Sequence, residues 1–204
     1  MSIFCLLWIP AFFFFRRSIA ADSGRGYTWA LLLGCLIVFL RYYFGHLVTP
    51  GGFGISRWFS SFVDIISLPV LIPFVIYCLL VKLRIFPAFD HTGSVDFILL
   101  SLVPVAAFHA ISNPQGFPLT LVFVPLLWTA QGAGIPFFVN FIVHNPRWYI
   151  ITFSLMGTIA LPLMAATSWW AFFSHQTLLG SLLFSASLIP AIVSVIVDVY
   201  KHKR

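Results

Sequence analysis

The chain has 204 residues, of which 61% are hydrophobic and only 8% carry a formal charge. Soluble domains carry charge on about a quarter of their residues, so this composition excludes a soluble globular protein and predicts a membrane protein in contact with a lipid bilayer. The net charge of +6 does not indicate a nucleic-acid partner. The basic residues lie at the ends of apolar runs, where they set topology and contact lipid headgroups.

Seven apolar runs follow one another along the chain, and a helix needs about 20 such residues to cross a bilayer. We expect membrane spans near 3–15, 28–47, 61–81, 97–112, 118–143, 149–172 and 177–200. Helices are expected because every backbone polar group in lipid needs an internal partner. The predicted fold is therefore an all-α, polytopic membrane helix bundle of about seven spans. No polar linker divides residues 1–204, which we expect to form a single integral membrane domain.

The first run, residues 3–15, is short for a span and has the length of a signal-peptide core. A signal peptide carries its positive charge before the apolar run, whereas Arg16 and Arg17 follow this one. We favour a short span with its N-terminus outside. Six spans plus an interfacial or re-entrant N-terminal helix is the alternative, and a natural start upstream is a third.

Most of the basic residues fall in alternate connections between the predicted spans. These residues are Arg16, Arg17, Arg25, Lys82, Arg84, Arg147, Lys201, Lys203 and Arg204. By the positive-inside rule their connections are cytoplasmic, and so is the C-terminus. We expect a multi-pass protein of a cell membrane, the inner or cytoplasmic membrane in a bacterium.

The third span holds an acid, Asp64, in a stretch that is otherwise apolar. It is the one acid expected deep within a span, and Arg41 near the outer end of the second span is its expected partner. The favoured interpretation is an ion pair that fastens these two spans at the membrane boundary. Binding of an ion, a proton or a polar solute is an alternative, and catalysis is a third. Pro69 and Pro73 should kink or open the helix beyond Asp64.

The fifth span contains a second polar stretch, Leu126–Asn140, with sequence LLWTAQGAGIPFFVN. Gln131 falls near the middle of the bilayer, and two glycines and Pro136 follow it. We expect a break here that leaves two half-helices, an arrangement that forms solute sites in transporters. Trp128 would stack on a ligand or fill space. Packing is the alternative, with the glycines admitting a neighbouring helix and Gln131 bonding between helices.

The last span carries a stripe of small and polar residues at helical spacing. Ser187, Ala191, Ser194 and Asp198 share one face, which we interpret as a packing surface. Asp198 lies within reach of Lys201 or His202 on the same helix.

Cysteines and histidines do not form a recognisable metal or disulfide pattern. Cys5, Cys35 and Cys78 are scattered in apolar runs, which argues against a disulfide framework or zinc site. His46, His109 and His175 map to the same side as Asp64. No local spacing supports a shared metal, so we predict no metal and no cofactor.

Several enzyme classes are excluded by absent motifs. The chain has no glutamate, no HExxH, no GxxxxGK[ST] phosphate loop and no GxSxG. We assign no catalytic residues and expect a protein that is not an enzyme, with a lipid-modifying enzyme as a weaker alternative.

The sequence leaves the molecular activity undetermined. Our first hypothesis is a membrane-embedded component of small-solute transport with an unknown small-molecule ligand. Its candidate substrate or ion pathway is formed by Asp64, Arg41, Gln131, Trp128 and Asn140. The alternative is a non-catalytic membrane subunit or scaffold that holds a protein partner in a larger complex.

Overall fold

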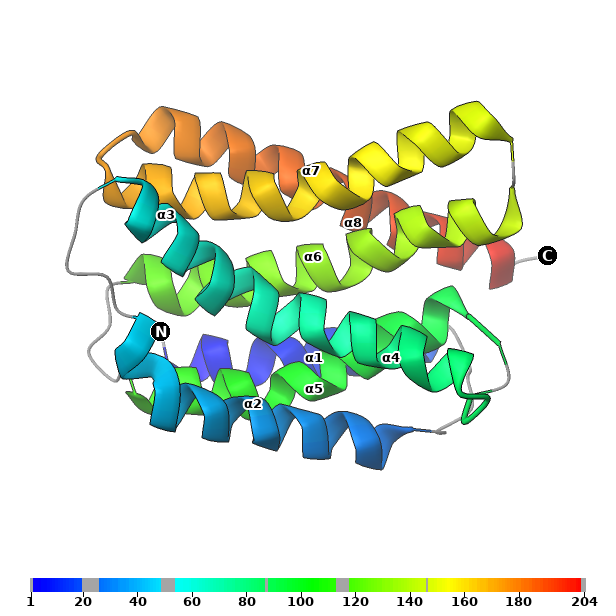
Figure 1. Ribbon diagram of the computed structural model, residues 1–204, viewed down its shortest axis with the longest axis horizontal. Helices are drawn as coiled ribbons and strands as arrows, with labels where there is room; N and C mark the ends of the chain where they lie inside the picture. The colour runs from blue at the N-terminus through cyan, green and yellow to red at the C-terminus, as the bar shows by residue number, and fades with distance from the viewer. Residues whose placement is uncertain are drawn as a thin grey trace.

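The computed structural model describes residues 2–19, 26–48, 54–86, 88–112, 118–145 and 147–202. Every regular element in these ranges is helical (Figure 1). The elements are α1 (Ser2–Ile19), α2 (Tyr27–Val48), α3 (Ile55–Ser61), η1 (Phe62–Leu71), α4 (Ile72–Lys82), α5 (His91–Ser112), α6 (Pro118–His144), α7 (Trp148–Phe173) and α8 (Thr177–His202). Helices α3, η1 and α4 follow without interruption and form one long rod.

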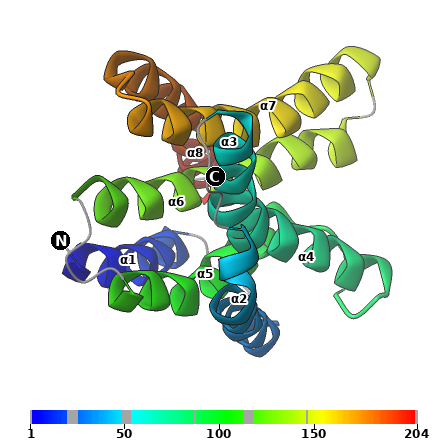
Figure 2. The ribbon, with the colours of Figure 1, turned by 60° about the vertical axis from the view of Figure 1, so that its left-hand side comes forward.

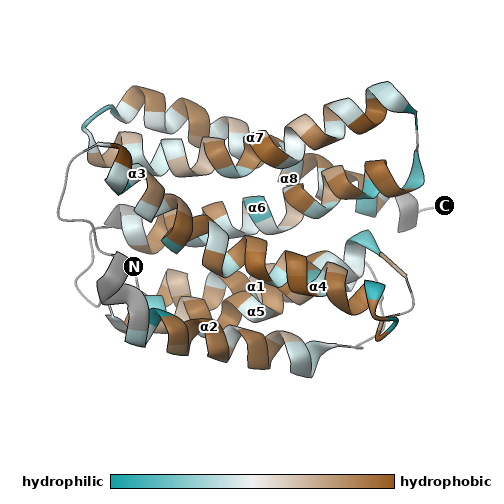
Figure 3. Ribbon diagram, in the orientation of Figure 1, coloured by the Kyte–Doolittle hydropathy of each residue, from teal (hydrophilic) through white to brown (hydrophobic). Residues whose placement is uncertain are grey.

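Five rods are long and apolar enough to cross a membrane. They are Ile55–Lys82, His91–Ser112, Thr120–His144, Trp148–Phe173 and Thr177–Tyr200, and α2 adds a shorter apolar helix. Apolar residues run along the rods, and hydrophilic residues gather at their ends and connections (Figure 3). The predicted all-helical membrane bundle is confirmed.

Helix α1 belongs to the bundle. It packs against α5 and α6, and both ribbon views place it beside α5 (Figures 1 and 2). Cys5, Ile9, Phe13 and Arg16 are buried at spacings of three and four residues, which places them on one helical face. Helix α1 is therefore part of the bundle, but it is not among the helices long and apolar enough to cross a membrane, so a short first span stays a prediction.

The basic residues of alternate connections meet at one end of the molecule, on the right in Figure 1. We call this the basic end and define it by Arg16, Arg17, Lys82, Arg84 and Arg147. The helix ends that carry them belong to α1, α4 and the turn between α6 and α7. Basic residues from alternate connections thus lie at the same end of the bundle. That this end faces the cytoplasm stays a prediction.

The predicted opening of the third span is confirmed as a π-helical segment, η1. In an α-helix the carbonyl of Ile65 would accept the amide of residue 69, but Pro69 has no N–H. The indole Nε1 of Trp128 donates to this carbonyl at 2.7 Å. A side chain of α6 therefore bonds to a backbone oxygen of η1 that has lost its α-helical donor.

The predicted break in the fifth span is wrong, because α6 runs continuously through Gly132, Gly134 and Pro136. Each glycine instead admits a neighbouring side chain. A Cβ at Gly132 would lie 3.1 Å from Ile98, and one at Gly134 would lie 2.6 Å from Leu161. Helix α6 packs against α1, α5, α7, α8 and η1. These neighbours keep α6 helical at Pro136, which lacks the N–H for one backbone hydrogen bond.

Helices α2 and α5 approach most closely at Gly34. A Cβ at Gly34 would collide with the carbonyl oxygen of Ser101 and lie 3.0 Å from the ring of Pro104. Because the colliding atom belongs to the backbone, rotation of a side chain does not relieve the clash. Any larger residue at this position forces the two helices apart.

We therefore expect Gly34→Ala to destabilise the protein by about 1–3 kcal/mol, the usual range for overpacking. The measurement is thermal unfolding of the detergent-solubilised protein. Cys35→Leu adds more volume on the exposed side of the same helix and should leave the melting temperature unchanged. Equal melting temperatures for Gly34→Ala and wild type would contradict the close approach.

Candidate functional site

Arg16 lies in the last turn of α1 and is only 1% exposed. Its Nη1 donates to Asp96 Oδ1 at 2.6 Å and to the carbonyl of Thr92 at 3.1 Å, and its Nη2 donates to Asp198 Oδ2 at 3.0 Å. Asp96 belongs to α5 and Asp198 to α8, so one guanidinium joins three helices. We call Arg16, Asp96 and Asp198 the ion cluster.

The ion cluster corrects three sequence predictions. Arg16 lies in the last turn of α1 and not in a connecting loop. Asp198 pairs with Arg16, while Lys201 and His202, its predicted partners, have side chains outside the described residues. Asp64 is not the one deep acid, because Asp96 is 2% exposed. The fourth span begins at His91 and not near residue 97.

The early start of α5 has a local cause. Asp90 caps the helix: its Oδ2 accepts the amide of Gly93 at 2.7 Å, and its carbonyl accepts the amide of Ser94 at 3.0 Å. The first turn then buries His91, whose Nε2 shares a hydrogen bond with Ser194 Oγ at 2.9 Å. A polar stretch thereby becomes a buried helical turn that faces α8.

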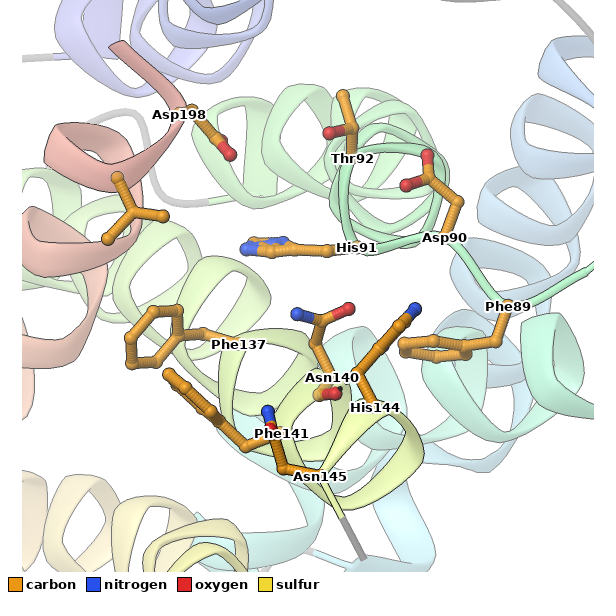
Figure 4. A pocket seen from close by; sticks show the side chains of 11 residues that line it. Phe89, Asp90, His91, Thr92, Phe137, Asn140, Phe141, His144, Asn145 and Asp198 are labelled. Carbon is orange, nitrogen blue, oxygen red and sulfur yellow. Dashed lines mark hydrogen bonds between the residues drawn. The ribbon is translucent and has the colours of Figure 1, made fainter. Parts of the chain in front are cut away.

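A cavity of about 470 Å³ lies at the basic end, where α5 begins and α6 and α8 end. Its lining residues are Phe89, Asp90, His91, Thr92, Phe137, Asn140, Phe141, His144, Asn145, Val197 and Asp198. Figure 4 shows His91 and Asn140 near its centre, with Asp90 and Asp198 toward either side. Cavities that bind small molecules have about 300–1,000 Å³.

The described part of the cavity wall combines acids, neutral polar groups and aromatic rings, without a lysine or arginine. Asp198 belongs to both the wall and the ion cluster, since its Oδ2 accepts from Arg16. The Oδ1 atoms of Asp198 and Asp90 form no hydrogen bond with the described part of the chain. Two carboxylate oxygens therefore remain available to a ligand.

The predicted partnership of Arg41 and Asp64 is confirmed. Arg41 Nη2 lies 2.8 Å from Asp64 Oδ1 and ties α2 to η1. The Asp64 side chain is 46% exposed, as expected near a membrane boundary. Trp128 lies close by, bonded to Ile65, and its ring meets His109 edge-on at 5.6 Å. Trp128 is thus held by η1 and α5.

Gln131 and Asn140 do not join Arg41 and Asp64 in one site. Gln131 is 0% exposed, and neither its Oε1 nor its Nε2 bonds to another described residue. The predicted interhelical bond of this amide is therefore not seen. Asn140 lies nine positions further along α6, about 14 Å away at 1.5 Å per residue, and lines the cavity at the basic end.

No three histidine, cysteine or aspartate side chains in the described ranges converge closely enough to hold a metal ion. Comparisons of the chain with protein-family models, curated proteins and solved structures found no match. The ion cluster and the cavity beside it are therefore interpreted from their own chemistry.

We expect Arg16→Met to destabilise the protein by about 3–5 kcal/mol, because it leaves two buried carboxylates without a counter-charge. The free energy of unfolding can be measured by SDS titration. Arg17→Met is the control, since the neighbouring guanidinium stacks over Tyr27 at 4.9 Å and bonds to no acid among the described residues. The triple variant Arg16→Met, Asp96→Asn, Asp198→Asn should recover much of the loss. Equal losses in the single and triple variants would contradict the charge argument.

We expect Trp128→Phe to cost about 0.5–1.5 kcal/mol, since it removes the hydrogen bond from the buried indole to the carbonyl of Ile65. Trp8→Phe is a matched control, because the indole of Trp8 reaches Thr129 at the longer distance of 3.4 Å in a less buried position. Its loss, measured in the same titration, should be smaller. A reversed order would show that Trp128 contributes by ring packing alone.

Proposed function

We propose that the protein is a membrane-embedded component of small-solute transport, and that its solute occupies the cavity at the basic end. The observation that carries this proposal is a cavity of about 470 Å³ walled by two spanning-helix ends and a helix start, with Asp198 shared with a buried ion cluster. Ionisable groups inside membrane bundles are costly and commonly mark solute or ion pathways.

Asp198 belongs to both the cavity wall and the ion cluster, so it can couple solute binding to helix packing. Arg16 fastens α1 to α8 through Asp198, and these two helices otherwise touch only slightly. A solute that attracts Asp198 weakens its bond to Arg16 and so loosens α1 from α8. Binding in the cavity and the packing of two helices thereby depend on one side chain.

The five sequence candidates do not share one site. Asn140 lines the cavity and belongs to the proposed solute site. For Arg41, Asp64, Trp128 and Gln131 a role in the pathway stays a prediction, and the contacts of the first three support helix packing.

A non-catalytic subunit of a larger complex is the second candidate. An apolar groove of about 350 Å³ between α1, α6 and α8 favours it. The groove is lined by Trp8, Phe12, Leu126, Thr129, Ala130, Leu188, Ala191, Ile192, Val195 and Ile196. Small residues such as Ala130 and Ala191 let a partner's helix approach closely in lipid.

The experiment for transport uses proteoliposomes exposed to pooled amino acids, amines, nucleosides and sugars, with mass spectrometry of the retained solutes. We expect uptake by wild type and its loss, by at least about tenfold, in Asn140→Leu, which replaces a polar side chain of the cavity lining and leaves the three charged residues of the ion cluster in place. Both proteins should melt at the same temperature.

Thr152→Leu on the exposed surface of α7 is the control and should transport normally. Normal uptake by Asn140→Leu would show that the solute does not bind in this cavity. A protein that accumulates nothing and co-purifies with a stoichiometric partner would support the subunit instead.

A further inference from the structure

We propose that the cavity at the basic end selects a small organic cation, either an amine or a quaternary ammonium compound. This inference rests on the proposed function in taking the cavity as the solute site. It adds the charge and the chemical class of the ligand.

The first argument is the balance of charge beside the cavity. One arginine faces two aspartates in the ion cluster, at 2.6 Å from Asp96 and 3.0 Å from Asp198. The cluster therefore carries an excess formal negative charge, and Asp198 is its member in the cavity wall. Asp90 adds a second carboxylate to the same wall. A cation in the cavity would lie beside the carboxylates of Asp90 and Asp198 and pair with them.

The second argument is the lack of a group for an anion. Among the described residues, the cavity lining contains no lysine and no arginine. The nearby Arg16 is already committed to two carboxylates and a backbone carbonyl. Lys82, Arg84 and Arg147 of the basic end lie outside the lining. A carboxylate or phosphate ligand would meet two acids, and the described part of the wall offers it no lysine or arginine.

The third argument separates an organic cation from a metal ion. Phe89, Phe137 and Phe141 line the cavity, and the last two rings pack edge to face at 5.0 Å. Aromatic faces attract alkylammonium groups, and this attraction grows when the cation is desolvated. The described residues offer no group of three metal-binding side chains. Phenylalanine rings with two carboxylates suit a cation that carries apolar surface.

Neutral polar groups complete the wall. Thr92 and Asn140 can bond to an ammonium N–H or to a hydroxyl of the ligand, and His144 lies beside them. Together with the cavity volume of about 470 Å³, these groups favour a compact molecule with one cationic head and a short polar or aromatic tail.

The experiment measures binding of matched probes to the full-length protein in nanodiscs by isothermal titration calorimetry. Choline is compared with its neutral isostere 3,3-dimethylbutan-1-ol, and benzylamine with benzyl alcohol and benzoate. We expect saturable binding of the two cations and at least about tenfold weaker binding of the neutral and anionic probes. Equal binding within either set would overturn the charge preference.

Asp90→Asn is the decisive variant, because asparagine also caps a helix and α5 should still begin at the same residue. We expect about tenfold weaker binding of choline at an unchanged melting temperature. Asp64→Asn removes the same charge at the other end of the bundle and should bind choline as wild type does. Phe141→Leu, which removes one ring but keeps an apolar side chain, should weaken choline binding several-fold.

The outcomes distinguish this inference from the proposed function. If benzyl alcohol, benzoate or another non-cationic solute binds and Asn140→Leu abolishes that binding, the cavity is a solute site and the cation preference is wrong. If none of these probes binds and proteoliposomes accumulate no solute, both proposals fail. Choline binding that Asp64→Asn weakens as much as Asp90→Asn would also overturn the site assigned here.

Discussion

The contact of Arg16 with Asp96 and Asp198 sets the arrangement of α1, α5 and α8. Removing three charges from water is costly, and only close, well-directed hydrogen bonds offset that cost. The guanidinium meets this condition at 2.6 and 3.0 Å. It lies in the last turn of α1, opposite the first turns of α5 and the final turns of α8, so the cluster fixes the depth at which α1 enters the bundle.

The other features of the basic end are linked to the contact between Arg16 and Asp96. Asp96 reaches Arg16 only because the Asp90 cap starts α5 two turns earlier than the apolar run. The same early turns bring His91 against Ser194 and form one wall of the cavity. The opposite end is held differently, by the pair of Arg41 and Asp64 and by the indole of Trp128. At both ends polar side chains link neighbouring helices, and at the basic end these contacts border the cavity of about 470 Å³.

The spans were predictable because hydrophobicity is a local property of the chain. The pairings within the ion cluster were not, since Arg16 lies 80 residues from Asp96 and 182 residues from Asp198. Asp96 also sat in a polar stretch that resembled a loop. A signal was present, because Asp90 precedes Gly93 and Ser94 at the spacing of a helix cap. The pair of Arg41 and Asp64 was predictable because antiparallel neighbouring spans bring their adjacent ends together.

The polar stretch of α6 shows why composition alone misled. Glycine and proline break helices in water, but in an enclosed membrane helix the glycines serve close packing against Ile98 and Leu161. Trp128 was expected to stack or to fill space. Its indole instead bonds to the carbonyl of Ile65, on η1, which has no α-helical donor because residue 69 is proline. No local sequence pattern shows that Trp128 of α6 lies opposite this carbonyl.

Labelling of a cysteine at position 140 tests most directly whether the ion cluster borders a hydrated, cation-selective cavity. Permeabilised membranes carrying Asn140→Cys would be treated with trimethylammonioethyl or sulfonatoethyl methanethiosulfonate, with the wild-type protein as background. We predict labelling of the folded protein, faster with the cationic reagent after correction for reactivity with a free thiol. Labelling only after denaturation, or equal corrected rates, would contradict this account.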